Sequence, residues 1–335
     1  MTAKYVTFES KKPSSLWQLQ DTYQGSSFFN GFEFFHDPDP THGFVNYVDQ
    51  RTAIDKNLIQ IQQETNDVLI KVDNHTVITP QDPIQGRNSV RISSLTTFED
   101  NGLFLFDIEH MPTGCGTWPA LWLLGPDWPH GGEVDIIEGV NLQSDNIMTL
   151  HTTTGCKQPP YVQQTGHTLT DNCAIDAPNQ GANQGCSVED DGPSPSFGAG
   201  FNLNGGGVFA VQWTPENGFQ LWFFGRDSIP HDIQLSLLQE THLPNPNEWG
   251  TPTAQFPFDP NYCSPRFFKQ LKIILNTTFC GDWAGNPVIY KNSTCPGKDC
   301  TDFVRNNPEK FSEAYWKIRG MKVYTKQQEE EYDSF

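Results

Sequence analysis

Apolar and polar residues alternate in short segments along much of the chain, which is the pattern of half-buried β-strands. We predict a strand for each of LIQIQQE (58–64), DVLIKVD (67–73), RNSVRISS (87–94), FFKQLKIILN (267–276) and YWKIRGMKVYT (315–325). Because the segments are short and are separated by turn-forming residues, the pattern is typical of an all-β protein.

The clearest pattern lies in VFAVQWTPENGFQLWFFG (208–225). Phe209, Val211 and Trp213 alternate with small or polar residues, and the alternation resumes after the turn-forming residues 214–218. This segment predicts a β-hairpin. Trp213 and Trp222 lie within its apolar runs, so we expect both in the core; Trp122 lies in a similar apolar run.

Long helical periodicity with capping residues is nearly absent. Two long stretches, 155–206 and 277–314, are irregular and contain six of the cysteines. Loops of this length in a compact domain are usually functional. Since no repeat and no linker divides the chain, we predict one β-sandwich domain over residues 1–335, with a frayed acidic tail at 326–335.

The composition excludes several classes of protein. Charged residues are only 18% of the chain and aromatic residues reach 13%, which disfavours disorder. The net charge is −19, from 40 acidic and 21 basic residues, so the surface repels phosphate backbones and we expect no nucleic-acid partner. No apolar run is long enough to span a membrane, and we expect a monomer.

The cysteines indicate an oxidising compartment. There are eight of them, an even number, and no CxxC or finger-like His spacing indicates zinc, so we predict disulfides, with the local pair Cys173–Cys186 as one candidate. Three glycosylation sequons begin at Asn74, Asn276 and Asn292. The chain begins MTAKYVTFES, which lacks the apolar stretch of a signal peptide. We therefore expect a secreted protein in its mature form.

Three acidic residues, Glu133, Asp135 and Glu138, lie within six positions of GEVDIIEGV. On a regular strand Glu133 and Asp135 share one face, whereas Glu138 would enter the apolar layer beside Val134 and Ile136. A β-bulge at Ile136–Ile137 would bring all three carboxyl groups onto one face.

The bulged arrangement suits glycoside hydrolysis with retention. Two glutamates about four strand steps apart can lean together to about 5–6 Å, the carboxyl separation of retaining enzymes. Asp135 between them would hydrogen-bond a neighbouring glutamate and help to separate the two pKa values. The alternatives are the polar face of an edge strand or a cation site. The spacing and glycine of an EF-hand are absent, and no E-x-x-H motif indicates a di-iron helix.

Longer motifs resemble glycoside hydrolase family 16, and in particular its fungal endo-1,3(4)-β-glucanases. They include GTWPALWLLGPDWPHGGEVDIIEGVN (116–141), THGFVNYVD (41–49), GRNSVRI (86–92), TLHTTTGC (149–156), FAVQWTP (209–215) and NTTFCGDWAGN (276–286). The matches follow the order of the family over most of the chain. The loop at 170–200 and the acidic tail depart from the common family pattern.

The resemblance implies a concanavalin A-like jelly roll of two antiparallel sheets with long loops. Glu133 would be the nucleophile, Glu138 the general acid/base and Asp135 an assisting group. Residues implied to bind the substrate are Asn46, Arg87, Trp118, Trp128, His151 and Trp283, with the tryptophans as sugar platforms. Arg91 is either a sugar ligand or structural.

The implied activity is endo-cleavage of β-1,3- or mixed-linkage β-1,3-1,4-glucan, without a cofactor or catalytic metal. A structural calcium ion is compatible with the family, but no ligand set stands out. A cell-wall transglycosylase would use the same covalent intermediate. A lectin would share the architecture without the chemistry.

Overall fold

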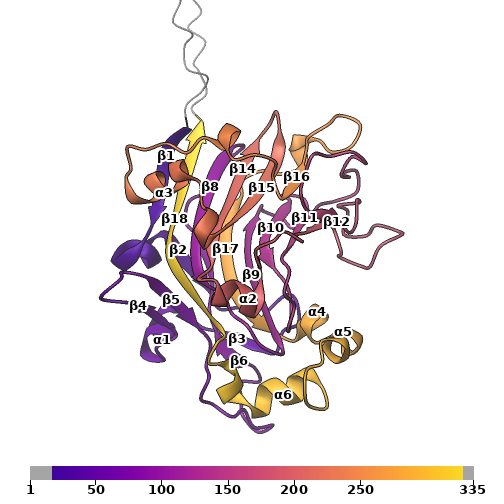
Figure 1. Cartoon of the computed structure of the whole chain (residues 1–335). Helices are drawn as coiled ribbons and strands as arrows, with labels where there is room; N and C mark the ends of the chain where they lie inside the picture. The colour runs from indigo at the N-terminus through magenta and orange to yellow at the C-terminus, as the bar shows by residue number, and fades with distance from the viewer. Residues whose placement is uncertain (1–16, 327–335) are drawn as a thin grey trace, which may run out of the picture.

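The computed structural model describes residues 17–326 as two large antiparallel sheets packed face to face (Figure 1). The first sheet has the strand order β16-β15-β14-β8-β18-β5-β4, with β1 also paired to β18, and the second has the order β12-β13-β11-β10-β9-β17-β7-β2. This confirms the predicted all-β sandwich. The frayed tail predicted from residue 326 onward lies, for 327–335, outside the described residues.

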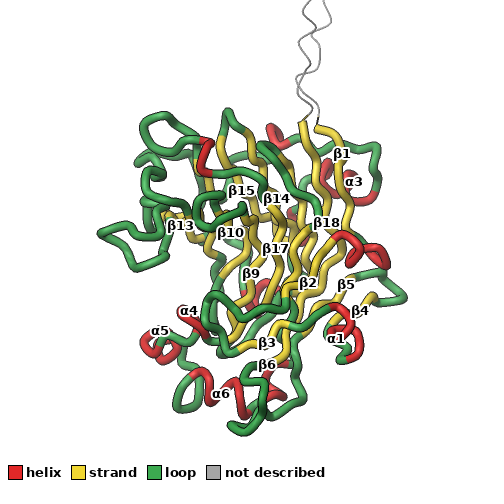
Figure 2. Tube along the Cα trace, turned by 180° about the vertical axis from the view of Figure 1, so that it is seen from behind, coloured by secondary structure: helices red, strands yellow, loops and turns green. Residues whose placement is uncertain are grey.

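The strands of the first sheet are β1 (Trp17–Tyr23), β4 (Ile59–Ile61), β5 (Val68–Lys71), β8 (Gly102–His110), β14 (Gly207–Thr214), β15 (Gly218–Gly225), β16 (Ala254–Phe256) and β18 (Tyr315–Lys326). Those of the second are β2 (Phe32–Phe35), β7 (Arg91–Ser94), β9 (Thr117–Leu124), β10 (Glu133–Glu138), β11 (Ile147–His151), β12 (His167–Thr168), β13 (Cys186–Glu189) and β17 (Lys272–Phe279). Figure 2 shows β10, β9 and β17 side by side at the centre of the second sheet.

The predicted hairpin is confirmed as β14 and β15. Successive side chains along it point into two different apolar clusters, one on each side of the sheet. Phe209, Val211 and Trp213 pack between the two sheets. Val208 and Trp222 face the other way, into a smaller cluster beneath helix α3 (His231–Leu238). Trp213 and Trp222 are therefore both core residues, in different clusters, because β14 is covered on both faces.

Two predicted strand boundaries were wrong. The segment 87–94 is not one strand, because β6 (Arg87–Ser89) pairs in parallel with β3 (Val45–Tyr47), while β7 joins the second sheet. The segment 267–276 begins as a 3-10 turn (Pro265–Phe267), and strand β17 starts only at Lys272.

The stretch 277–314 is also more regular than predicted. It contains α4 (Gly281–Ala284), α5 (Pro287–Asn292), α6 (Cys300–Asn306) and the 3-10 turn Pro308–Phe311. These short elements bury Tyr290, Phe303 and Phe311 in a cluster of their own at one end of the sandwich (Figure 1). The remaining short elements are α1 (Gln50–Asp55), α2 (Gly198–Leu203) and the 3-10 turns Gly25–Gly31, Arg226–Ser228 and Pro246–Glu248.

All eight cysteines are paired, as Cys115–Cys295, Cys156–Cys263, Cys173–Cys186 and Cys280–Cys300. The expected local pair Cys173–Cys186 is confirmed. Two bridges hold the end cluster, because one joins Cys115, just before β9, to the α5–α6 segment and the other joins the start of α4 to α6. Within the described residues, no helix is long and apolar enough to cross a membrane.

We predict that replacing Cys280 and Cys300 together by Ser lowers the free energy of unfolding by about 3 kcal/mol, because the bridge closes a loop with a separation of 20 residues. Urea unfolding measures the change. The matched control is the double Ser variant of Cys173–Cys186, with a separation of 13 residues, which should leave the end cluster intact. A native protein with two or more titratable thiols would contradict the pairing itself.

Candidate active site

The three acidic residues lie on β10, between β9 and β11. Across to β9, Glu133 pairs with Leu124, Asp135 with Trp122 and Glu138 with Ala120. The register shifts between Asp135 and Ile137, which leaves Ile136 as the extra residue of a β-bulge. The predicted bulge is confirmed: all three acids lie opposite even-numbered residues of β9, so they share one face of the sheet.

The other face of β10 belongs to the core. Val134, Ile136 and Ile137 are each 0% exposed and pack between the sheets. Glu133 and Glu138 are half-buried on the opposite face, whereas Asp135 between them is only 1% exposed. One strand therefore carries an apolar layer and an acidic cluster back to back.

His151 on β11 completes the cluster, since it pairs with Glu133 across the sheet. Its Nε2 lies 3.2 Å from Asp135 Oδ2, although the alignment is not that of a hydrogen bond. One ligand atom from each of Glu133, Asp135 and His151 falls within 4.8 Å of the others. These three residues are the set that the described chain offers for a metal ion near the acids.

Two tryptophans donate hydrogen bonds to the glutamates. Trp118 Nε1 donates to Glu138 Oε1 at 2.8 Å, and Trp128 Nε1 donates to Glu133 Oε2. Trp283 on α4 packs edge-on against Trp118, with 5.5 Å between ring centroids. The structure therefore gathers Trp118, Trp128, Trp283 and His151 around the acids, as the sequence analysis expected.

Burial raises the pKa of each of the three carboxyl groups. The pKa of Glu133 rises to about 8, through burial and then the negative charge of Asp135. The pKa of Glu138 rises to about 7 through burial, although the Trp118 hydrogen bond and His151 act in the opposite direction. Burial and the charge of Glu138 hold the pKa of Asp135 well above its usual range. The three carboxyl groups together therefore retain protons near neutral pH.

A substrate-binding role for Arg87 was a wrong expectation. Its side chain is 0% exposed, and its guanidinium donates to the backbone carbonyl oxygens of Asp73, Thr76 and Val304. It also stacks on Phe311 at 4.9 Å. Arg87 therefore joins the strand β6 to the end cluster, and a sugar cannot reach it. Asn46 is half-buried and donates to Asn88 Oδ1 at 2.7 Å, so its contact with a sugar remains a prediction.

Trp122 and Asn276 continue the acidic face, and neither was expected there from the sequence. Trp122 lies opposite Asp135, and its Nε1 donates to Asn276 Oδ1 at 2.8 Å. Arg91 lies over the Trp122 ring at 5.1 Å and over Phe35 at 4.4 Å. The available signal was strand parity, because Trp118, Ala120 and Trp122 are all even-numbered positions of β9.

The sequon at Asn276 was wrongly counted as a candidate glycosylation site. Asn276 lies within β17, is 7% exposed, and its Nδ2 donates to the Tyr47 hydroxyl at 3.3 Å. A glycan on that nitrogen would displace the hydrogen bond and has no space. Asn292, at the end of α5, is exposed and Asn74 is half-buried.

The sequence as a whole identifies the family. Residues 32–324 match the model described as XgeA-like, catalytic GH16 domain. The chain belongs to glycoside hydrolase family 16. An endo-1,3(4)-β-glucanase of Arthroderma benhamiae is 42% identical over 318 residues, which cover 93% of this chain and 65% of that protein. A protein of Aspergillus clavatus described as a probable endo-1,3(4)-β-glucanase is 39% identical over 330 residues, which cover 96% of this chain but only 48% of that longer protein.

Solved structures of family 16 proteins match the fold closely. GH16 Laminarinase 16A from Phanerochaete chrysosporium, solved with two β-glucans in its donor and acceptor sites, is 44% identical with a TM-score of 0.85; the match covers 93% of this chain and all of that one. An elongating family 16 β-1,3-glucosyltransferase is 42% identical with a TM-score of 0.82, and covers 92% of this chain and all of its own.

We predict that Glu138→Gln stabilises the protein at neutral pH. The folded-state pKa of Glu138, about 7, exceeds its ordinary value of 4.5, so the folded protein binds the proton more tightly than the unfolded chain does. Wild-type stability is therefore lost as pH rises from 4.5 through 7, and the uncharged Gln avoids this loss while Oε1 still accepts from Trp118. The expected gain in unfolding free energy is roughly 3 kcal/mol at pH 8 and nothing below pH 4.5. Urea unfolding at pH 4 and pH 8 checks this, and an equal gain at both pH values would contradict it.

A second prediction concerns the bulge. Deleting Ile136, which yields the same chain as deleting Ile137, gives E-V-D-I-E, whose three acids share one face of a regular strand. We expect the variant to fold and to retain part of its activity, at a cost of about 2–5 kcal/mol for the lost buried side chain. Ile136→Ala is the matched control, since it keeps the bulge and loses the same packing. A folded deletion variant with Glu138 turned into the core would refute the parity argument.

Proposed function

We propose that this family 16 domain is a retaining endo-β-glucanase, with Glu133 as nucleophile and Glu138 as general acid/base. The observation that supports this most directly is the shared face of Glu133, Asp135 and Glu138, which the β10 bulge creates beside Trp118 and Trp283. Glycosidases that retain configuration need one ionised and one protonated carboxyl group on opposite sides of the bond that breaks. A cluster that holds protons near neutral pH can supply both.

Catalysis would proceed in two displacements. Glu138 donates its proton to the glycosidic oxygen while Glu133 attacks the anomeric carbon, which forms a covalent glycosyl-enzyme. Glu138 then takes a proton from water, and the water releases the sugar with its original configuration. Asp135 lies between the two glutamates and would share a hydrogen bond with Glu133, which raises the pKa of Glu133 and helps to hold a proton within the cluster. The Trp128 indole supports the nucleophile from the other side.

The substrates that we propose are β-1,3-glucan and mixed-linkage β-1,3-1,4-glucan. The support is the identity to an endo-1,3(4)-β-glucanase and the likeness to a laminarinase that binds two β-glucans. Trp118 and Trp283 would provide the aromatic surfaces on which the apolar faces of glucose rings pack. His151 and Asn46 would contact the sugar. The four disulfides suit a secreted protein. We propose that it acts as a monomer and as one domain.

Transfer to a second sugar is the alternative activity. It is favoured by the 42% identity to an elongating β-1,3-glucosyltransferase, because transfer and hydrolysis differ only in whether a sugar hydroxyl or water attacks the same intermediate. A non-catalytic lectin is disfavoured, since binding alone does not require three carboxyl groups with raised pKa values on one strand. Side-by-side digestion of laminarin and barley mixed-linkage glucan, with sizing of the products, separates these activities: shorter products support hydrolysis and longer ones support transfer.

We predict that azide rescues the two glycine variants with opposite stereochemistry. In Glu133→Gly, azide occupies the nucleophile position and displaces the leaving group of an activated β-glycoside directly, which yields the α-glycosyl azide. In Glu138→Gly, azide attacks the glycosyl-enzyme and yields the β-azide. Proton NMR of the products distinguishes the two anomers. The reverse pattern would exchange the two roles, and no rescue of either variant would argue against a covalent mechanism.

A further inference from the structure

Two hollows lie on the outer face of the first sheet, on the side of the sandwich away from the acidic cluster. One has a volume of about 350 Å³ and the other about 450 Å³, within the roughly 300–1,000 Å³ of ligand pockets. Lys71, Ser312 and Tyr315 line both, so the hollows adjoin across β5 and β18. We call the pair, centred on Lys71 and Tyr315, the outer hollow.

Tyr315 forms a fixed aromatic platform in the outer hollow. Its ring stacks in parallel on His110, with 3.7 Å between centroids and 6° between planes. His110 is held in turn, because its Nδ1 lies 2.9 Å from the Tyr315 carbonyl oxygen and its Nε2 lies 3.0 Å from Asn202 Nδ2. Burial lowers the pKa of His110, although the Tyr315 carbonyl oxygen and Glu313, whose Oε2 lies 3.3 Å from Nε2, act in the opposite direction. Contacts within the protein therefore hold the Tyr315 ring in place.

Beside the platform are polar groups without partners. Tyr315 and Lys71 are paired across β18 and β5 and point to the same outer face. Within residues 17–326, no hydrogen bond acts on the Lys71 amine or on the Tyr315 hydroxyl. An aromatic ring next to free hydrogen-bonding groups suits a ligand that has both an apolar face and hydroxyl groups.

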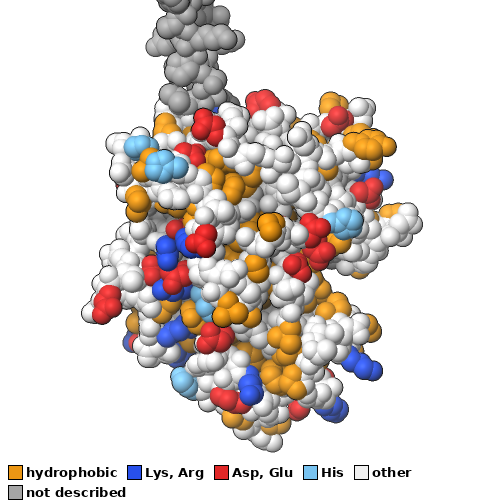
Figure 3. Space-filling view, in the orientation of Figure 1, with side chains coloured by type: hydrophobic (Ala, Val, Ile, Leu, Met, Phe, Trp, Pro, Cys, Tyr) orange, Lys and Arg blue, Asp and Glu red, His pale blue; other side chains and the backbone are white. Residues whose placement is uncertain are grey.

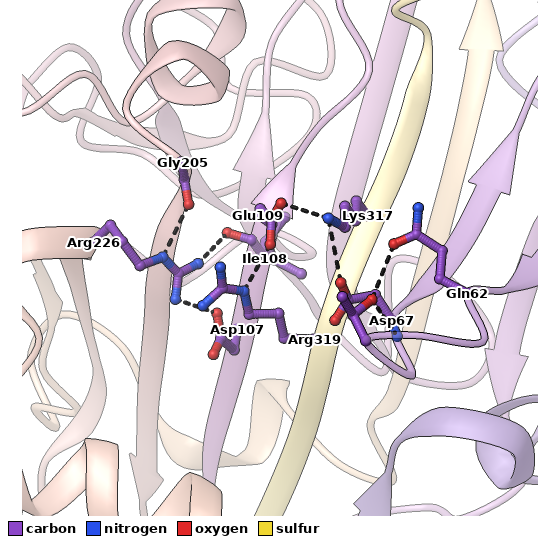
Figure 4. Close-up of polar contacts among 10 residues, drawn as sticks. Gln62, Asp67, Asp107, Ile108, Glu109, Gly205, Arg226, Lys317 and Arg319 are labelled. Carbon is purple, nitrogen blue, oxygen red and sulfur yellow. Dashed lines mark hydrogen bonds and ion pairs between the residues drawn. The ribbon is translucent and has the colours of Figure 1, made fainter.

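Several charged side chains beside the outer hollow form ion pairs with one another. Figure 4 shows a row of ion pairs on this face, and Figure 3 shows acidic and basic side chains gathered in one patch on the same side. Lys317 contacts both Glu109 at 2.6 Å and Asp67 at 3.3 Å, and Arg319 contacts Glu109 at 2.8 Å. Of the charged residues that line the outer hollow, Glu109 and Lys317 thus already satisfy each other, so neither needs an ionic ligand.

The two ionic alternatives fit less well. An anion would approach a protein of net charge −19, and Asp55, Asp73 and Glu109 line the same hollows. A cation would meet the unpaired amine of Lys71. A neutral polyhydroxylated chain avoids both costs.

We propose that the outer hollow is a second binding site for a β-glucan chain, separate from the acidic cluster. This inference rests on the proposed function, which supplies a polymeric substrate. A polymer held at the outer hollow stays near the active site, and its effective concentration there rises without any change in the catalytic groups. A short oligosaccharide cannot span the two faces, so it gains nothing.

The test separates polymer from oligomer with Tyr315→Ala, which removes the platform. We expect the KM for laminarin to rise about fivefold, while kcat/KM for laminarihexaose stays unchanged. Tyr315→Phe is the matched control, because it keeps the ring and should remain within about twofold of wild type on both substrates. The protein is produced without N-glycosylation, since Asn74 lines one of the hollows.

Two further measurements keep the outcome decisive. Ser312 is exposed and lines both hollows, so Ser312→Arg blocks the site without touching the core and should reproduce the rise in KM even if Tyr315→Ala folds poorly. Calorimetric titration of Glu138→Gln with laminarihexaose should give two sites, falling to one when Tyr315→Ala is added. Unchanged laminarin KM in both folded variants, with one site throughout, would overturn the inference. A wild-type protein that cleaves no glucan would instead overturn the proposed function.

Discussion

The alternation of side chains along a single strand is the constraint on which this site depends. β10 must send Val134, Ile136 and Ile137 into the space between the sheets, because these side chains are part of the main core. It must also present Glu133, Asp135 and Glu138 together on the opposite face. An odd spacing between acids cannot meet both demands on a regular strand. One extra residue in the register meets them, so the bulge links the stability of the sandwich to its chemistry.

The acidic face has an energetic cost that the surrounding side chains reduce only in part. The indole N–H groups of Trp118 and Trp128 each donate to one glutamate, and His151 lies against Asp135. None of these supplies a fixed positive charge like that of an arginine. The pKa values of the acids therefore remain raised, and the protons that the cluster retains are those that glycoside hydrolysis needs.

On the outer face of the first sheet, in contrast, the acidic side chains have basic partners. There Asp107, Glu109 and Asp67 each contact a basic side chain, Arg226, Arg319 or Lys317 (Figure 4). Asp67 and Asp107 are only 6% and 8% exposed, and the basic partners reduce the cost of burying their charges. Among the described residues, the three acids of β10 thus lack a basic lysine or arginine partner, whereas these acids of the first sheet have one.

The sequence by itself determined the fold class and the acids, because both follow from local alternation. The hairpin predicted at 208–225 and the bulge predicted at Ile136–Ile137 are consequences of side-chain parity along neighbouring residues. The resemblance of whole motifs added Trp118, Trp128, His151 and Trp283 around the acids. Only the tertiary structure decided whether isolated polar residues are buried and which partners they bind. Arg87 is buried beneath the end cluster and Asn276 bonds to Trp122 and Tyr47, and neither outcome is visible in the residues next to them. Such contacts join segments far apart in the chain, and burial at a distance leaves no signature in local periodicity.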